Sequence, residues 1–202
     1  AEVLRRWARG LKIQLSVAHV HHGTRASAKQ KLYRSRAKIL VREWCKKNQI
    51  PFYSNRAESL ELKSEADLRE YRLRWLKAWK AQSGASHIVF AHHRDDLLET
   101  RILRLIRGTG AQGLESMRKQ QGASLRPLLG VSRFEIERYA EARKIKFAED
   151  PSNRKTLPLR NWLREEWLPM LEKKRPGSKA SLARSLEILS ENAVVESKFD
   201  VG

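Results

Sequence analysis

Short apolar runs alternate with amphipathic stretches over the first half of the chain. The apolar runs have the length of buried strands, and the stretches between them repeat their apolar residues at the period of a helix. These candidate elements span residues 15–20, 27–48, 51–54, 64–84, 87–91 and 95–107. Strands that alternate with helices of this length form βαβ units with parallel strands and right-handed crossovers. The sequence therefore predicts an α/β fold with a doubly wound parallel sheet.

Local signals mark several helix ends. Residues 64–67 and 132–135 have the spacing of a capping box, so we expect a helix to begin at each. Gly84 and Gly108 each end a helix, because glycine readily adopts the left-handed conformation found at helix C-termini.

Both ends of the chain are predicted to be helical. Residues 3–7 indicate the end of an amphipathic helix that Gly10 closes. A doubly wound fold normally places a strand and a turn before such a helix, so we expect the sequence to begin inside the fold, truncated at its first strand. Near the end, helices are expected at 159–174 and from 178 onward, divided by Pro176-Gly177.

The chain carries a large positive charge. Its formal net charge is +19 and its pI is about 10.5, and the first 50 residues contain 13 basic and 2 acidic side chains. Such a charge repels itself unless a polyanion neutralises it. RNA, DNA and anionic lipid surfaces are the candidate partners, and nucleic acid is favoured.

Other classes of protein are disfavoured. No apolar run approaches the roughly 18 residues of a membrane span, and the opening AEVLRRWARG lacks the apolar region of a signal peptide, so we expect a cytoplasmic protein without membrane contact. Cys45 is the single cysteine, which excludes an intrachain disulfide and any site built from Cys pairs. Its place on the apolar stripe of 27–48 predicts a core position.

Residues 108–113 spell G-x-G-x-x-G. They follow a helix rather than a strand, so they do not form the strand-to-helix turn that binds a pyrophosphate. We interpret them as a helix end followed by a flexible loop that can still touch a ligand.

Histidines lie at the carboxyl ends of the first and third predicted strands, at 19–22 and 92–93, where ligands bind in this fold class. Strand alternation aims His19 and His21 away from His22, and no residues that would orient metal ligands are evident nearby. No dedicated metal site is therefore predicted.

Asp96 and Glu99 are three residues apart in the first turn of the helix at 95–107, so both carboxylates project together beside His92. Such a pair can hold a cationic amine, share Mg²⁺ with phosphates or accept a proton. An acidic first turn also stabilises the helix dipole, and the spacing alone leaves both interpretations open.

Two arginine pairs share helix faces. Arg69 and Arg72 lie on one side of a helix, and Arg160 and Arg164 are one turn apart. Either pair can grip a phosphate or a carboxylate, although each pair taken alone is more simply explained as solvated arginines. Residues 150–153 are most simply a turn whose side chains bond their own backbone.

Six segments in collinear order resemble one family. They are AHVHHGTR (18–25), SEADLREYRLRWL (64–76), AHHRDDLLETRILRLIRGTGAQGL (91–114), RPLLGVSRFEIERYA (126–140), EDPSN (149–153) and RNWLREEWLP (160–169). Together they resemble the tRNA(Ile)-lysidine synthases, from about residue 3 to about residue 185. Members of that family are N-type PP-loop ATP pyrophosphatases, which adenylate the wobble cytidine of an isoleucine tRNA and let the side-chain amine of lysine displace AMP.

The resemblance implies an organisation and a set of partners. Residues 1–170 would form a PP-loop nucleotide-binding domain of the adenine nucleotide alpha hydrolase type, and 171–202 a helical linker or the start of a C-terminal domain. The implied cofactors are ATP and Mg²⁺. The implied partners are tRNA(Ile) with a CAU anticodon and free L-lysine, and a homodimer is left open.

The resemblance also implies roles for matched residues. Asp96 and Glu99 would hold the lysine amine or help to remove its proton. Arg69 or Arg72 would lie near the lysine or the adenylate. The nucleotide would be lined by His22, His92, Gly108, Thr109 and Gly110. The residues that would bind the tRNA beside the active site are Arg25, Asp150, Asn153, Arg160, Asn161 and Arg164.

One family feature does not occur in this sequence. The phosphate-binding S-G-G-x-D-S loop is absent, because none of the 10 glycines lies in such a context. We expect the chain to begin just after that loop, as a truncated product, a fragment or a degenerate relative, and the C-terminal substrate domain of the family to be absent or only begun.

Three alternative functions remain. A sister PP-loop enzyme that thiolates tRNA cytidine is disfavoured, because such sulfur transfer uses Cys pairs and Cys45 stands alone. A non-catalytic tRNA-binding module would keep the basic face without the nucleotide loop. A metal hydrolase would be built on the histidine runs.

The missing loop leads to a direct prediction. We expect these 202 residues by themselves to give little or no ATP turnover, because the backbone amides that would cradle the phosphates are not present. An ATP–pyrophosphate exchange assay checks this, and robust exchange by this chain would overturn it.

Overall fold

The computed structural model describes residues 1–21, 28–55, 64–148 and 159–199. The chain forms two compact units. The first contains residues 1–88 and 146–152, and the second contains residues 89–145 and 153–202.

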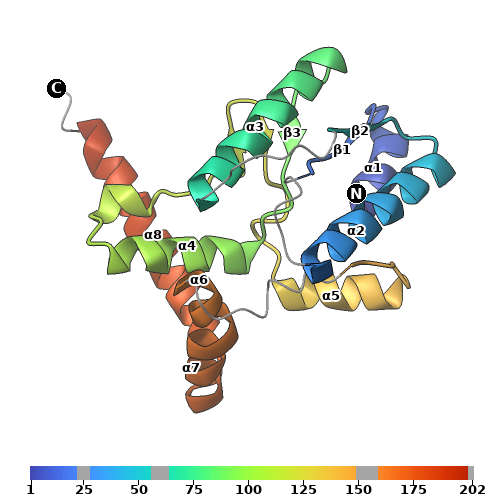
Figure 1. Cartoon of the computed structure of the whole chain (residues 1–202). Helices are drawn as coiled ribbons and strands as arrows, with labels where there is room; N and C mark the ends of the chain where they lie inside the picture. The colour runs from blue at the N-terminus through green and yellow to red at the C-terminus, as the bar shows by residue number, and fades with distance from the viewer. Residues whose placement is uncertain (22–27, 56–63, 149–158, 200–202) are drawn as a thin grey trace. The chain divides into compact units, whose positions relative to one another are not determined.

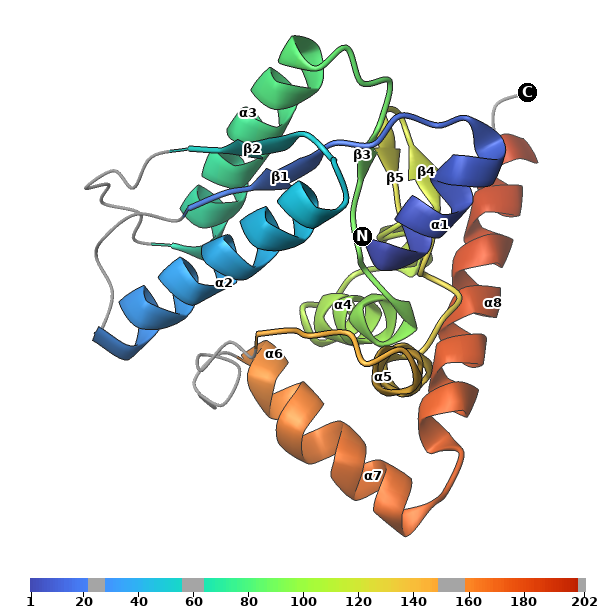
Figure 2. The same cartoon turned by 90° about the vertical axis from the view of Figure 1, so that its right-hand side faces the viewer.

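The first unit is a parallel strand pair between helices. Its elements are α1 (Glu2–Leu11), β1 (Val17–His19), α2 (Ala28–Lys47), β2 (Phe52–Ser54) and α3 (Glu65–Gln82). β1 and β2 pair in parallel, with Val17 opposite Phe52 and His19 opposite Ser54. α2 and α3 lie on opposite sides of this pair (Figures 1 and 2). The order β1-α2-β2 is the predicted βαβ unit.

Aromatic side chains fill the first unit. Cys45 of α2 is 1% exposed, which confirms its predicted core position. Tyr71 and Trp79 of α3 are also buried. Trp75 stacks on Trp79, with 5.3 Å between ring centroids. One face of α3 therefore presents aromatic rings one turn apart, as its apolar periodicity indicates.

Two helix starts follow the predicted capping boxes. The Ser64 hydroxyl accepts from Asp67 N at 3.0 Å, and Ser64 N donates to the Asp67 carboxylate at 2.9 Å. The same reciprocal pair joins Ser132 and Glu135 before α5 (Arg133–Ala142). Each box satisfies backbone N–H groups that the first turn leaves without helical partners.

The end of α1 differs from the prediction. The helix continues through Gly10 to Leu11 and ends at Lys12, whose φ is 52°. Lys12 takes the left-handed conformation that is usually left to glycine, and its backbone N–H donates to Ala8 O. Gly10 therefore does not close this helix.

The second unit is built around α4 (Arg94–Ile106). β3 (Ile88–Val89) spans the residues at which the first unit ends and the second begins. The other elements of the second unit are the 3₁₀ turn η1 (Ala111–Leu114), β4 (Gln120–Gln121), β5 (Ser124–Leu125), α5, α6 (Leu159–Trp162), the π-helical turn η3 (Leu163–Trp167), α7 (Leu168–Lys174) and α8 (Ser178–Phe199). β3, β5 and β4 form a sheet in that order, and Phe90 N donates to Leu125 O at 2.8 Å.

The antiparallel hairpin β4–β5 was not predicted. Gln121 pairs with Ser124 across the two residues of the turn, and Gly122 there has a φ of 54°. Glycine supports a tight hairpin because it adopts a positive φ without strain. The segment lacks the apolar alternation that signals a strand, since both residues of β4 are exposed glutamines.

Seven leucine and isoleucine side chains form the core of the second unit: Leu98, Ile102, Leu103, Leu114, Leu163, Leu168 and Leu186. They come from α4, η1, the 163–168 segment and α8, so the last two helices share one core with α4 (Figure 1). The helix division at Pro176-Gly177 is confirmed, because α7 ends before it and α8 begins after it. The predicted domain boundary at residue 170 stays a prediction.

The α/β class is confirmed, with a helix-rich architecture and shorter strands than the apolar runs indicated. β1 covers three residues of the predicted six, and β3 covers two of the predicted five. Among the residues described, no helix combines the length and apolarity that crossing a bilayer requires.

The core makes a testable prediction about α8. Replacing Leu186, which is 4% exposed, by Ala should lower the free energy of unfolding by about 2–5 kcal/mol, because the methyl groups leave a cavity beside α4. Leu189→Ala is the matched control on the same helix, since Leu189 is 50% exposed. Urea denaturation followed by circular dichroism measures both, and equal losses would contradict this packing.

Candidate active site

The N-terminus of α4 is fixed by a capping box that was not predicted from the sequence. His93 is the N-cap residue, in extended conformation. Its backbone N–H donates to the Asp96 carboxylate at 3.0 Å, and Asp96 N donates to His93 Nδ1 at 3.4 Å. Histidine replaces the usual Ser, Thr, Asp or Asn, so the signal was missed. Asp96 is thereby held in the first turn, directly after the segment that contains His92.

Two arginines converge on the carboxylates of α4. Arg160 Nε lies 2.9 Å from Glu99 Oε2, and Arg164 Nε lies 2.7 Å from Glu99 Oε1. Arg164 Nη2 donates to Glu99 Oε2 at 2.8 Å and to Asp96 Oδ1 at 3.2 Å. Both oxygens of Glu99 are therefore occupied, one of them by two arginines. We call Asp96, Glu99, Arg160 and Arg164 the ionic cluster.

The ionic cluster is partly removed from water. The Glu99 side chain is 2% exposed, that of Asp96 15%, that of Arg164 24% and that of Arg160 33%. A buried carboxylate persists as an ion only when it is paired and hydrogen-bonded, and the bidentate arginine supplies both. The hydrogen bond to Glu99 raises the pKa of Arg164 above its ordinary value. Two negative and two positive charges leave the cluster neutral.

The predicted regular helix at 159–174 is interrupted where it reaches the ionic cluster. Residues 163–167 form a π-helical turn that contains Arg164, between α6, which carries Arg160, and α7. Such turns are rare and occur frequently at functional sites. Leu163, on the same turn, is 1% exposed in the core.

Thr100 is a member of the site that sequence reasoning missed. Its hydroxyl donates to Asp96 O at 2.7 Å and accepts from Arg160 Nη2 at 3.3 Å. Arg160 Nη2 also donates to Asp96 O at 3.4 Å, so Arg160 is bound to the helix backbone as well as to Glu99. The Glu99-Thr100 pair within the resembling segment is the only sequence signal for it.

A second group lies at the carboxyl end of β3. The His92 ring is half-buried and stacks on Phe90, with 5.7 Å between centroids and 28° between planes. The guanidinium of Arg126 also lies over the Phe90 ring, 5.7 Å from its centroid. Arg126 is 7% exposed and was not singled out as a site residue, because a lone Arg before Pro carries no spacing signal.

The glycine-rich loop follows the end of a helix, as predicted, but it continues into the 3₁₀ turn η1 where a flexible loop was expected. Gly108 follows α4 with a φ of 79°. The Thr109 side chain fills the space that a Cβ on Gly113 would need, which explains a glycine there. Arg104 donates to Gly113 O, so the end of the loop is held against α4.

Arg101 extends this anchoring and was also missed. It is 8% exposed, and its guanidinium donates to Leu114 O at 3.3 Å and to the Ser190 hydroxyl at 2.9 Å. Burial lowers the pKa of Arg101. α4 therefore carries carboxylates toward Arg160 and Arg164, and arginines toward η1 and α8.

The other predicted site residues are distributed as follows. Arg69 is exposed and Arg72 half-buried on α3 of the first unit, and Asn161 is half-buried on α6. His22, Arg25, Asp150 and Asn153, also predicted as site residues, lie outside the described residues. The roles proposed for all of these residues stay predictions.

Asn55 joins the ends of the two strands of the first unit and was not predicted. It is 3% exposed and follows β2, while His21 follows β1. Asn55 Oδ1 accepts from His21 N at 2.6 Å, and its Nδ2 donates to His21 O at 2.9 Å and to the Tyr71 hydroxyl at 2.7 Å. Burial lowers the pKa of His21. An Asn directly after a strand was the available signal.

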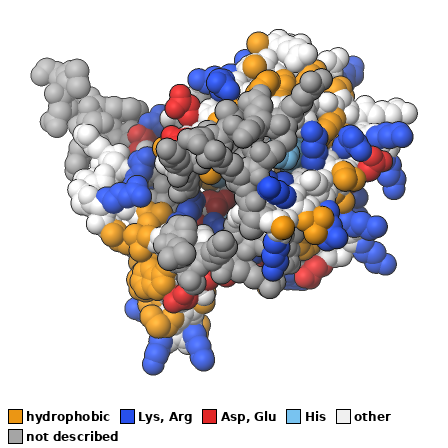
Figure 3. Space-filling model, in the orientation of Figure 1, with side chains coloured by type: hydrophobic (Ala, Val, Ile, Leu, Met, Phe, Trp, Pro, Cys, Tyr) orange, Lys and Arg blue, Asp and Glu red, His pale blue; other side chains and the backbone are white. Residues whose placement is uncertain are grey.

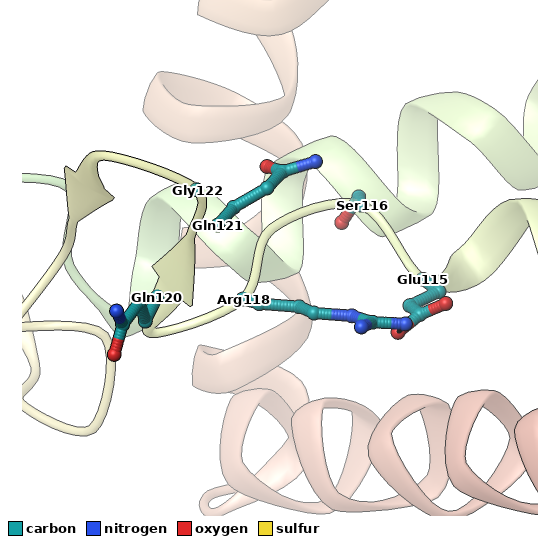
Figure 4. A pocket seen from close by; sticks show the side chains of 6 residues that line it. All are labelled: Glu115, Ser116, Arg118, Gln120, Gln121 and Gly122. Carbon is teal, nitrogen blue, oxygen red and sulfur yellow. Dashed lines mark ion pairs between the residues drawn. The ribbon is translucent and has the colours of Figure 1, made fainter.

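An open pocket of about 400 Å³ lies away from the ionic cluster, around the hairpin (Figure 4). It is lined by Glu115, Ser116, Arg118, Gln120, Gln121 and Gly122. Arg118 and Glu115 form an ion pair across it. None of the predicted site residues lines it. Within the described part of the chain, no group of three or more His, Cys, Asp or Glu is placed to hold a metal ion.

Comparison with known families matches residues 1–171 to the model of the PP-loop domain. The chain belongs to the PP-loop domain family. The match covers the first unit and the second as far as residue 171, including α4, the glycine-rich loop and the two arginines of the ionic cluster. A solved structure with the same fold is the U34-tRNA thiolase NcsA from Methanococcus maripaludis with its [4Fe-4S] cluster, with a TM-score of 0.70 and 18% identity. The alignment covers 94% of this chain and 66% of that one.

Curated relatives of this PP-loop chain carry the name tRNA(Ile)-lysidine synthase. The one from Bdellovibrio bacteriovorus is 45% identical over 177 residues, which are 88% of this chain and 55% of that protein. The one from Geobacter sulfurreducens is 35% identical over 197 residues, covering 94% of this chain and 41% of that protein. The chain thus spans about half the length of these relatives. The resemblance indicated by the motifs is confirmed.

Asp95, next to the ionic cluster, gives a pH-dependent prediction. The His93 side chain, and then the backbone N–H of Arg133 at 2.8 Å, lower the pKa of Asp95 to about 2 from 3.8. A carboxylate with a lowered pKa in the folded state stabilises that state above the unfolded pKa, and this contribution is lost as the pH falls from about 4 towards 2. The loss should be on the order of 1–2 kcal/mol.

Asp95→Asn tests this, because the amide oxygen can still accept from Arg133 but does not titrate. Between pH 5 and pH 2 the unfolding free energy of the original chain should fall more steeply than that of the variant, as measured by urea titration. Parallel curves would show that Asp95 has an ordinary pKa.

Proposed function

We propose that this chain carries the active-site residues of a tRNA(Ile)-lysidine synthase, which uses ATP to join lysine to the wobble cytidine of tRNA(Ile) through an adenylated intermediate, with little or no turnover by these 202 residues alone. One observation carries the proposal. Asp96 and Glu99 lie side by side at the start of α4, partly shielded from water, in a chain that is 45% identical to a protein of that name.

The chemistry requires such carboxylates. A lysine side chain attacks only as the neutral amine, yet it arrives protonated at neutral pH. A carboxylate that first binds the ammonium and then accepts its proton both positions and activates the nucleophile. Asp96 suits this role better than Glu99, because it is more exposed and its carboxylate carries fewer arginine contacts.

The neutral ionic cluster limits how lysine can enter. Adding an ammonium to a balanced, half-buried group of charges is unfavourable unless another cation leaves. Arg164 is the cation that would leave, because its hydrogen bonds in the ionic cluster are to the two carboxylates that the ammonium would take over, whereas Arg160 is also held to α4 by Asp96 O and the Thr100 hydroxyl. A released guanidinium would find a new anion in the phosphate of the adenylate.

The remaining parts of the proposal follow the family resemblance. Arg69 or Arg72 would meet the lysine or the adenylate, and His92 with the loop at 108–110 would line the ATP site. Mg²⁺ would neutralise the phosphates beside these residues. The tRNA(Ile) anticodon region would meet Arg160, Asn161 and Arg164 and the segments around 25 and 150–153. A homodimer and a cytoplasmic location also remain proposals.

A second candidate function is a tRNA-binding module without catalysis. The observation that favours it is the absence of S-G-G-x-D-S from the sequence, together with the +19 charge. Such a module would bind tRNA in a salt-sensitive manner. It would not incorporate lysine, even as the full-length product of the gene.

Asp96→Asn separates these functions in the full-length gene product. The rate of radiolabelled lysine incorporation into tRNA(Ile) should fall by about 10²-fold or more, because the amine loses its proton acceptor. The affinity for tRNA, measured by filter binding, should change less than about threefold, since loss of one carboxylate removes no phosphate contact.

Asp95→Asn is the matched control, because it removes the same charge one residue away and outside the ionic cluster. It should retain lysine incorporation. Equal losses of incorporation and tRNA affinity in Asp96→Asn would indicate a structural role instead, and no incorporation by the original protein would favour the binding module.

A further inference from the structure

The solvent-facing side of α2 is rich in basic side chains. Six of its cationic side chains are exposed: Lys29, Lys31, Arg36, Arg42, Lys46 and Lys47. α2 contains one carboxylate, Glu43. Lys and Arg side chains gather over the part of the molecule formed by α1 and α2 (Figure 3). The opposite side of α2 holds the buried Cys45, so the helix separates a core face from a cationic face.

Three of these cations lie along one line of the helix. At 100° per residue, Lys29, Arg36 and Lys47 project within about 20° of each other, and they are spaced about 10 and 16 Å apart along the axis. We call these three side chains the α2 row. Lys and Arg side chains clustered along one helix are the electrostatic footprint of a nucleic-acid-binding surface.

The α2 row has no acidic partner among the residues that the structure describes. Glu43 projects within about 40° of the α2 row, between Arg36 and Lys47, and its carboxylate lies 3.6 Å from Arg42. The three cations of the α2 row therefore outnumber the one carboxylate on their side of the helix. Basic side chains at this density repel one another, and an external polyanion removes that repulsion. The face is therefore complementary to a chain of phosphates.

A membrane surface fits this face less well. Helices that lie in a bilayer interface bury a continuous apolar face, usually with Trp, Phe or Leu. The exposed side of α2 offers Leu32 and Ile39, each 52% exposed and set among cations. This apolar area is too small and too interrupted for insertion.

We propose that the α2 row binds the phosphate backbone of the RNA substrate, outside the residues that perform the reaction. The identity of the RNA as a tRNA rests on the proposed function. The surface itself rests on the geometry of α2. Each cation would contact about one phosphate, so the α2 row would contribute about three of the phosphate contacts.

Charge reversal tests this proposal with the 202-residue chain. Lys29, Arg36 and Lys47 are replaced together by Glu, and binding of tRNA(Ile) is measured by filter binding from 50 to 200 mM salt. The variant should bind at least about tenfold more weakly, and the slope of log K against log salt should become shallower by about two to three, one unit per phosphate contact. Circular dichroism should show unchanged helix content.

The control changes the net charge equally at scattered positions. Lys77, Lys119 and Lys173 are exposed and are replaced together by Glu. Binding should weaken less than about threefold, because no row is interrupted. Equal weakening in the two variants would overturn the assignment of the surface, since long-range charge would then explain the binding.

The remaining outcomes are also decisive. If the original chain binds tRNA but the α2 row variant binds equally well, the surface is wrong while the proposed function stands. If the original chain binds vesicles containing 30% phosphatidylserine through the α2 row and does not bind tRNA, the proposal that the α2 row binds RNA is wrong. The proposed function is then contradicted as well, because it requires tRNA binding.

Discussion

The buried carboxylate of Glu99 determines how the second unit is organised. An ionised side chain that is 2% exposed is tolerated only with full compensation, and Arg160 and Arg164 provide it from a segment more than 60 residues away in the sequence. These contacts hold the helix segment from α6 to α7 against α4. Removal of either partner would leave a buried charge, so the two segments are coupled through electrostatics as well as through the leucine core.

The same helix uses charge differently on its other side. Arg101 and Arg104 of α4 donate to backbone carbonyls of Leu114 and Gly113, and Arg101 also reaches Ser190 of α8. α4 thus positions a glycine-rich loop with its arginines and a pair of arginines with its carboxylates. A single helix thereby fixes both the loop proposed to lie near the nucleotide and the carboxylates proposed to receive the amine.

Local signals in the sequence predicted the elements well, because their physical causes are local. The capping boxes at Ser64 and Ser132, the apolar period that buries Cys45 and the break at Pro176-Gly177 all depend on residues within a few positions of each other. The spacing of Asp96 and Glu99 likewise predicted that they lie together. The resemblance to a family supplied the functional context that spacing alone left open.

Features that depend on distant partners were missed. The burial of Glu99 follows from arginines on another segment, and the contacts of Asn55 follow from Tyr71 and from the end of β1. The π-helical turn at 163–167 and the β4–β5 hairpin lack a distinctive local pattern. No periodicity reports which side chains will meet across the fold, so the ionic cluster became visible only in three dimensions.

In the proposed reaction, lysine takes the place of Arg164 at the carboxylates of α4. The most direct measurement is a crystal structure of the full-length gene product with L-lysine and a non-hydrolysable ATP analogue. We expect the lysine Nζ within hydrogen-bonding distance of Asp96 or Glu99, with the Arg164 guanidinium turned away from them toward phosphate. Lysine bound elsewhere, with both Arg164 contacts intact, would contradict it.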